Sequence, residues 1–126
     1  NAFKNCEGIE TITFAPRTED LTIGDYAFYN CKSLSTITLP ASLKTMGTYG
    51  ANGELDSVHV FDGCINLTAI NVENGNTAFA SADGILYAKD SNGNATMLVL
   101  CPAKNTQSTV TIPATVTEIF EKLLKA

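Results

Sequence analysis

The sequence is poor in the residues on which most enzymes and nucleic-acid-binding proteins depend. It has one histidine, His59, and its 8 Lys and Arg residues stand against 13 Asp and Glu, for a net charge of -5. Because phosphate groups are bound by clustered basic side chains, this balance argues against a nucleic-acid partner. The chain also lacks an apolar run of about 18 residues, the length that spans a bilayer, so we expect no membrane insertion.

Motifs for catalysis and metal binding are missing as well. The sequence has no Gly-x-Ser-x-Gly, no Gly-rich phosphate loop before a helix and no Cys-x-x-Cys pair. We therefore predict a protein that is not an enzyme and holds no cofactor and no metal. A hydrolase that uses a carboxylate pair, such as Asp56 with Asp62, is the alternative, although carboxylates are common on any acidic surface.

The sequence does contain a repeated unit. Residues 27–39 read Ala-Phe-Tyr-Asn-Cys-Lys-Ser-Leu-Ser-Thr-Ile-Thr-Leu, and residues 2–14 and 60–72 repeat the same order of Phe, Cys and alternating apolar positions. Residues 109–119 follow the pattern of residues 36–46 as a fourth, partial copy. Since one such unit cannot bury its own apolar side chains, the copies are expected to stack on one another.

This unit resembles the BspA-like leucine-rich repeat, whose pattern is Ala-Phe-x-x-Cys-x-x-Leu-x-x-Ile-x-Leu-Pro-x-x-Leu-x-x-Ile-Gly. The resemblance covers nearly the whole chain. The sequence departs from the family pattern in the spacer of residues 47–58 and in the last seven residues. It implies a leucine-rich-repeat solenoid of stacked short parallel β-strands with turns and short helical segments, plus an inserted β-hairpin. It also implies a secreted or cell-surface bacterial protein used in adhesion and other protein contacts.

We expect one leucine-rich-repeat domain over residues 1–126. Its repeats are placed at about 2–26, 27–59 and 60–108, with a hairpin insert at 76–102 and a partial repeat with a helical cap at 109–126. The cap is predicted because Thr115 and Glu118 fit a capping box, and an irregular tail is the alternative. Because the chain starts without Met and inside a repeat, we expect a fragment or a mature form.

Alternation of apolar and polar residues predicts a half-buried strand in each copy, at residues 12–14, 37–39, 70–72 and 110–112. The equivalent cysteines of stacked copies, Cys6, Cys31 and Cys64, would point the same way, which favours buried free thiols. Disulfides are the alternative. The positions expected to build the interior are Phe3, Cys6, Phe28, Cys31, Leu34, Ile37, Leu39, Phe61, Cys64, Leu67 and Ile70.

The outward face of the predicted sheet carries two rows of small side chains. Stacking aligns Thr11 and Thr36 with Ala69 in one row, and Thr13, Thr38, Asn71 and Thr111 in the next. Thr is a good strand residue in its own right, so the rows are explained either by strand stability or by a flat contact face. The residues predicted to bind are Thr11, Thr13, Thr36, Thr38, Asn71, Thr111 and Tyr49.

Tyr49 lies in the spacer of residues 47–58, which is rich in turn-forming residues and is predicted to be a surface loop. The hairpin insert is predicted from apolar runs at 85–88 and 97–100 joined by the polar loop 90–94. That loop resembles the start of an EF-hand, but Ala95 and Cys101 replace the Gly and Glu that calcium requires, so an ordinary turn is expected.

These observations predict a non-enzymatic, extracellular module that displays a rigid repeat surface to a protein or glycan ligand, for example in host extracellular matrix. A purely structural spacer within a larger surface protein is the alternative. Self-association through the open N-terminal repeat edge is a further expectation, because no cap precedes the first copy.

Overall fold

The computed structural model describes residues 3–53, 55–106 and 108–120, and these residues form short strands and turns. No helix occurs among them, so the predicted short helical segments are wrong for this part of the chain. The strands are β1 (Thr11–Ile12), β2 (Leu21–Ile23), β3 (Thr36–Leu39), β4 (Leu43–Met46), β5 (Thr48–Tyr49), β6 (Leu55–Ser57), β7 (Ala69–Val72), β8 (Phe79–Ala82), β9 (Ile85–Lys89), β10 (Ala95–Leu100) and β11 (Glu118–Ile119).

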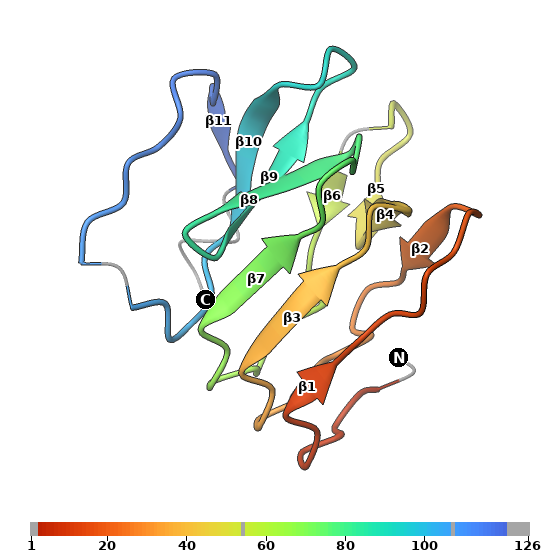
Figure 1. The fold of residues 1–126 in the computed structure, drawn as a ribbon, viewed down its shortest axis with the longest axis vertical. Helices are drawn as coiled ribbons and strands as arrows, with labels where there is room; N and C mark the ends of the chain where they lie inside the picture. Colours follow the sequence, from red (N-terminus) through yellow and green to blue (C-terminus); the bar gives the residue numbers. More distant parts are fainter. Residues whose placement is uncertain (1–2, 54, 107, 121–126) are drawn as a thin grey trace.

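A parallel sheet in the order β1-β3-β7 runs through the three copies of the repeat (Figure 1). Thr36 pairs with Thr11 on one side and with Ala69 on the other, which confirms the predicted stacking register. The alternation in β3 buries Ile37 and Leu39 and exposes Thr36 and Thr38. A second parallel pair, β2-β4, comes from the later part of the first two copies and lines the same core.

Tight turns that carry Phe and Cys form a ladder on the far side of the core. We call residues 3–6, 28–31 and 61–64 the Phe–Cys turns. Their rings stack with centroids 5.5 Å and 5.7 Å apart. Each turn places its third residue in the left-handed region, at φ 64° and 59° for Asn5 and Asn30 and 80° for Gly63. Asn and Gly tolerate that conformation better than other residues do, which explains their presence there.

The ladder cysteines link one Phe–Cys turn to the previous one. The Sγ of Cys31 donates to the carbonyl oxygen of Phe3, and that of Cys64 donates to the carbonyl oxygen of Phe28, both across 3.1 Å. All four cysteines are free, and Cys31 and Cys64 are buried as predicted, whereas Cys6, in the turn at the outer end of the stack, is only half-buried. Most of the expected interior positions are fully buried, whereas Phe3 is 40% exposed because its turn lies at the outer end of the stack.

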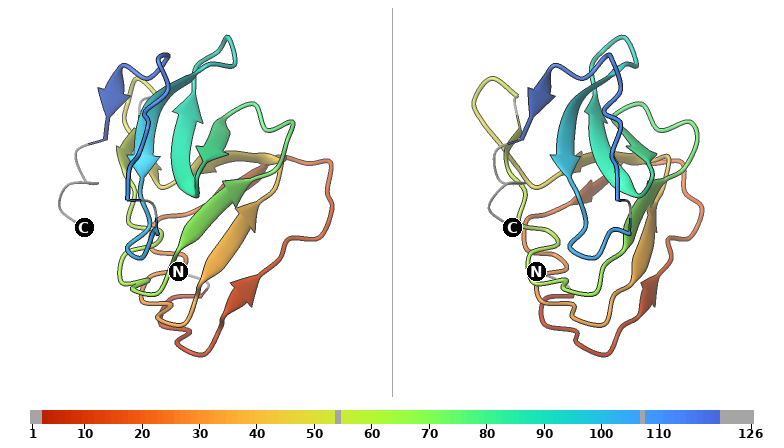
Figure 2. Two further views of the ribbon diagram at one scale, coloured as in Figure 1. Left: turned by 60° about the vertical axis from the view of Figure 1, so that its left-hand side comes forward. Right: turned by 90° about the vertical axis from the view of Figure 1, so that its left-hand side faces the viewer.

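The predicted hairpin is present as β9 and β10, and β8 extends it to an antiparallel sheet. The turn between β8 and β9 uses Asp83 and Gly84, both with positive φ. The inserted strands lie beyond β7, at the opposite end of the stack from β1 (Figure 2). They cover its edge, since the N–H of Ile70 donates to the Gly84 carbonyl (2.8 Å) and that of Val72 to Ser81 Oγ (2.9 Å).

The fourth copy does not form the strand expected at residues 110–112. Instead β11 pairs in parallel with β10, and the N–H groups of Thr117 and Phe120 donate to the carbonyls of Thr96 and Leu98, each across 2.9 Å. Thr115 Oγ1 donates to the Ala95 carbonyl, so it does not cap a helix. The predicted helical cap is therefore wrong over residues 115–120, and its remainder at 121–126 lies outside the described residues.

Two further features were not predicted. The spacer of residues 47–58 is not an irregular loop, because β5 and β6 pair antiparallel within it. The side chain of Asn76 is buried and holds four backbone groups: its Nδ2 donates to the carbonyls of Pro40 and Leu43, and its Oδ1 accepts from the N–H groups of Ala78 and Phe79. Asn76 thus fixes the point at which the insert leaves the stack.

Candidate functional site

The outward face of the parallel sheet brings most of the predicted binding residues together. Thr11 pairs with Thr36, Thr38 pairs with Asn71, and all four side chains are exposed. Their opposite face is the buried core, so the backbone beneath them is held in place by packing as well as by the ladder. Side chains on such a surface keep fixed spacing without needing a partner to order them.

A groove of about 310 Å³ opens in this face between β1 and β3. β1 ends at Ile12, so the following residues diverge from β3 and leave a hollow. We call it the Thr groove. Its lining residues are Thr11, Ile12, Thr13, Phe14, Thr36, Ile37, Thr38, Pro40 and Glu73.

Glu73 supplies the carboxylate of the Thr groove. Its Oε1 accepts a hydrogen bond from the N–H of Ala41 across 2.9 Å, which positions the exposed side chain at the end of the groove. A smaller cavity of about 180 Å³ continues from there, shares Phe14, Pro40 and Glu73 with it, and reaches Arg17. The combined surface offers hydroxyl groups, one anion, one cation and an aromatic ring, a set suited to a polar ligand with some apolar surface.

Sequence reasoning missed Phe14, Pro40 and Glu73 as lining residues. Phe14 stands at the strand position that Leu39 occupies in the next copy. The aromatic ring at that position is the feature of the sequence that could have indicated the groove. Glu73 gave no signal, because it follows the end of β7 and reaches the groove only through the bond to Ala41.

Two predicted binding residues lie elsewhere. Thr111 is exposed in an irregular segment and is not aligned with Thr38. Tyr49 is half-buried, and its hydroxyl accepts a hydrogen bond from the N–H of Met46 across 3.2 Å. Burial raises the pKa of the Tyr49 phenol above its ordinary value. Tyr49 therefore joins β5 to the core instead of presenting a free ring.

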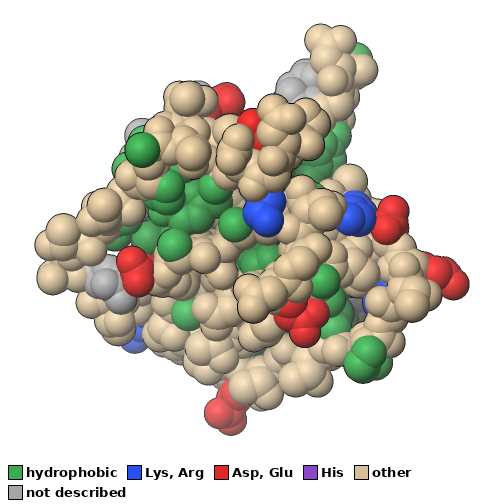
Figure 3. Space-filling view, turned by 45° about the horizontal axis from the view of Figure 1, so that its top comes forward, with side chains coloured by type: hydrophobic (Ala, Val, Ile, Leu, Met, Phe, Trp, Pro, Cys, Tyr) green, Lys and Arg blue, Asp and Glu red, His purple; other side chains and the backbone are tan. Residues whose placement is uncertain are grey.

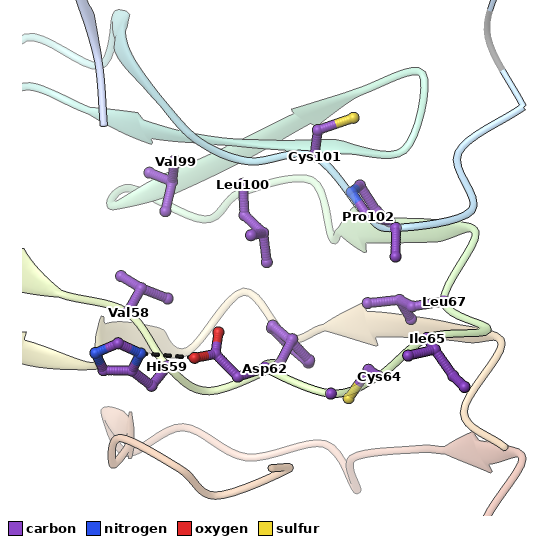
Figure 4. A pocket seen from close by; sticks show the side chains of 13 residues that line it. Val58, His59, Asp62, Cys64, Ile65, Leu67, Val99, Leu100, Cys101 and Pro102 are labelled. Carbon is purple, nitrogen blue, oxygen red and sulfur yellow. Dashed lines mark hydrogen bonds and ion pairs between the residues drawn. The ribbon is translucent and has the colours of Figure 1, made fainter. Parts of the chain in front are cut away.

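A second groove, of about 450 Å³, lies between the third Phe–Cys turn and the end of β10. We call it the apolar groove. Val58, Cys64, Ile65 and Leu67 line one wall, while Val99, Leu100 and Pro102 line the other (Figure 4). His59 and Asp62 lie at one end, with the His59 Nδ1 and Asp62 Oδ2 atoms 2.7 Å apart.

The apolar groove does not assemble a nucleophile with that pair. The thiol of Cys64 already donates to Phe28, and burial raises the pKa of Cys64 to about 11, which keeps it protonated at neutral pH. The Cys101 side chain points away from the groove in Figure 4. Among the described residues, no cluster of three or more His, Cys, Asp and Glu is placed to hold a metal ion, and no helix is long and apolar enough to cross a membrane.

Charge is spread thinly over the surface. On the face shown in Figure 3, acidic side chains are scattered singly, and hydrophobic side chains gather in a hollow. The whole chain carries a net charge of -5.

Residues 1–81 match the family described as BspA type Leucine rich repeat region (6 copies). The chain belongs to this family. The resemblance found in the sequence is thereby confirmed, and the BspA-type repeat accounts for the short parallel strands and the Phe–Cys turns. This family is generally non-catalytic.

Solved structures extend the comparison of this BspA-type chain. A leucine-rich repeat protein from Eubacterium ventriosum has 29% sequence identity and a TM-score of 0.59 over 84% of the chain. The pneumococcal vaccine antigen PcpA is similar over 80% of the chain, with 22% identity and a TM-score of 0.49. The chain spans only 24% and 29% of the lengths of these two proteins. No curated protein matches it.

Proposed function

We propose that the chain is a non-enzymatic interaction module of a cell-surface or secreted protein, and that the Thr groove binds a protein or glycan ligand. Membership of the BspA-type family supports a surface protein that acts through contacts. In this proposal the stacked copies form part of a solenoid, which holds the groove rigid.

The observation that carries the proposal is the lining of the Thr groove. Thr11 and Thr13, in and just after β1, and Thr36 and Thr38, in β3, line one hollow of about 310 Å³. Hydroxyls can both donate and accept, so they suit the hydroxyl groups of a sugar or the backbone of a peptide. Because these residues lie on a packed sheet, binding would cost little ordering entropy.

A triple variant, Thr13→Lys, Thr36→Lys and Thr38→Lys, tests the proposal. The purified proteins are compared for binding to a panel of extracellular-matrix proteins and mucin glycans. The matched control is Thr106→Lys, Ser108→Lys and Thr109→Lys, which adds the same charge at exposed positions of an irregular segment.

We expect the wild type and the control variant to bind one member of the panel, and the folded groove variant to bind it at least about tenfold more weakly, since each Lys obstructs the hollow. Equal binding by the groove variant would refute the proposal. If the wild type binds nothing on the panel, the structural-spacer reading is favoured instead.

A further inference from the structure

Asparagine is followed by glycine three times in the sequence, at Asn52-Gly53, Asn74-Gly75 and Asn92-Gly93. Such a pair can modify itself without an enzyme. The backbone nitrogen of the glycine, once it has lost its proton, attacks the side-chain Cγ of the asparagine, and the side-chain amide leaves as ammonia. Glycine favours this ring closure, which gives a succinimide, because it has no side chain in the way.

Water then opens the succinimide at one of its carbonyl groups. One product carries aspartate in place of asparagine. The other carries isoaspartate, in which the backbone runs through the former side-chain carbon and is longer by one methylene group. The whole reaction consumes water and releases ammonia, so it needs no oxidant, reductant or cofactor. In a folded protein its rate depends on whether the glycine nitrogen and the asparagine side chain are free to meet.

In two of the three pairs the glycine nitrogen already donates a hydrogen bond. The N–H of Gly93 donates to the Asp90 carbonyl across 3.1 Å, in a turn where Asp90 Oδ1 also accepts from the N–H of Asn92 (2.9 Å). The N–H of Gly53 donates to the Gly50 carbonyl across 3.0 Å. These bonds must break before either nitrogen can attack, which slows the reaction.

The pair Asn74-Gly75 has no such protection. Both residues are exposed, and no described residue accepts the Gly75 N–H or bonds to the Asn74 side chain. The two residues form a turn after β7, which is closed only by a long bond of 3.4 Å from the N–H of Asn76 to the Glu73 carbonyl. The reacting atoms of this pair are therefore open to water and unbonded within the described chain.

This turn lies between two fixed points. On one side, the N–H of Glu73 donates to the Leu39 carbonyl (2.9 Å), and Glu73 Oε1 accepts from the N–H of Ala41 (2.9 Å). On the other side, the buried side chain of Asn76 holds four backbone groups where the insert leaves the stack. An extra backbone carbon between Glu73 and Asn76 would strain one of these two sets of bonds.

We propose that Asn74 is a site of spontaneous deamidation in the folded protein. Isoaspartate formed there lengthens the turn, so it loosens the attachment of the insert at Asn76 and displaces Glu73 from the end of the Thr groove. The reaction itself does not depend on the function proposed for that groove.

The test incubates the whole folded chain at mildly alkaline pH for several weeks. Samples are digested, and the peptides that contain residues 52, 74 and 92 are analysed by mass spectrometry, with electron-based fragmentation to distinguish aspartate from isoaspartate. We expect residue 74 to convert several-fold faster than residues 52 and 92, and to give mainly isoaspartate. The free energy of unfolding should fall as the isoaspartate fraction grows.

Two controls separate structure from local sequence. In the chain unfolded by guanidinium chloride the three pairs have similar surroundings, so we expect them to react at similar rates. The Asn74→Gln variant keeps an amide at the exposed position, but its longer side chain closes the ring far more slowly. After the same incubation this variant should keep its free energy of unfolding.

Three results would overturn the proposal. The first is conversion of residue 74 no faster than that of residues 52 and 92 in the folded chain. The second is the same ratio of rates in the unfolded chain, because the free Gly75 N–H would then have no effect. The third is isoaspartate at position 74 with an unchanged free energy of unfolding and unchanged NMR signals from the Ala41, Ala78 and Phe79 amides, since both fixed points would then tolerate the longer turn.

Discussion

The thiol of Cys64 lies 3.1 Å from the carbonyl oxygen of Phe28, in the preceding Phe–Cys turn. This contact gives a buried thiol a hydrogen-bond acceptor, and it needs the protonated form, because a thiolate cannot donate. The stability of the stack therefore depends on the protonation state of Cys64, a residue type usually considered for its redox chemistry.

The first prediction concerns alkaline pH. Burial raises the pKa of Cys64 from 9.0 to about 11. An unfolded chain then releases this proton at lower pH than the folded chain does, so the free energy of unfolding should fall as pH rises from about 9 to about 11, by up to about 2 kcal/mol. Urea unfolding at pH 8 and pH 10.5 would measure the loss. The Cys64→Ala variant should lose less over the same interval, and an unchanged pH dependence would show that Cys64 is not responsible.

The second prediction concerns the ring ladder. Phe28 is buried between Phe3 and Phe61, with ring centroids 5.5 Å and 5.7 Å away. We expect Phe28→Leu to lower the free energy of unfolding by about 1–2 kcal/mol, through two lost stacking contacts and imperfect repacking. Phe3→Leu should cost less than half as much in the same urea titration, because Phe3 has one stacked neighbour and is 40% exposed. Equal losses would argue against the ladder as a source of stability.

The third prediction concerns Asn76. Its side chain makes four hydrogen bonds of 2.7–3.0 Å to backbone groups. Asn76→Ala would leave these groups without partners in a buried place, so we expect a loss of about 3 kcal/mol or more in the free energy of unfolding. Asn74→Ala, two residues earlier at an exposed position, should change it by about 0.5 kcal/mol or less. Chemical denaturation of both variants would measure the two losses, and equal losses would contradict a structural role for Asn76.

The fourth prediction concerns the turn at Gly84. It has φ 80°, and a Cβ there would lie 2.9 Å from the Cβ of Ala69 in β7. Gly84→Ala should therefore combine a strained backbone with a collision, for a loss of at least about 2 kcal/mol in the free energy of unfolding. Gly93 has φ 84° but open space around it, so Gly93→Ala should cost about 1 kcal/mol from the backbone alone. Thermal unfolding would rank the two, and the reverse order would mean that the insert does not pack on β7 as described.

Patterns local to one repeat were predictable from the sequence, and so was the register between repeats. The Phe–Cys spacing and the alternation around Ile37 recur in three copies, and stacking identical units can align them in only one way. The hairpin of β9 and β10 was predictable for the same reason, since apolar runs and a polar turn lie close together along the chain.

What could not be predicted depends on contacts between segments that are distant in sequence. The segment 110–119 carries the strand pattern of the repeat and a capping box, yet β10 offers it an edge, and Glu118 and Ile119 pair there instead. The Thr groove was predicted only in part. The threonines follow from the repeat, whereas Glu73 reaches them through its bond to Ala41, 32 positions earlier in the chain.

The stacked turns also determine how the protein would carry a mechanical load. The hydrogen bonds between successive Phe–Cys turns, and those that join β1, β3 and β7, all cross from one copy to the next. A pull along the stack would open them one layer at a time, whereas a pull along the strands would load every bond of a layer together in shear. A protein built this way would separate readily when pulled at the two ends of the stack and would resist a force applied along its strands.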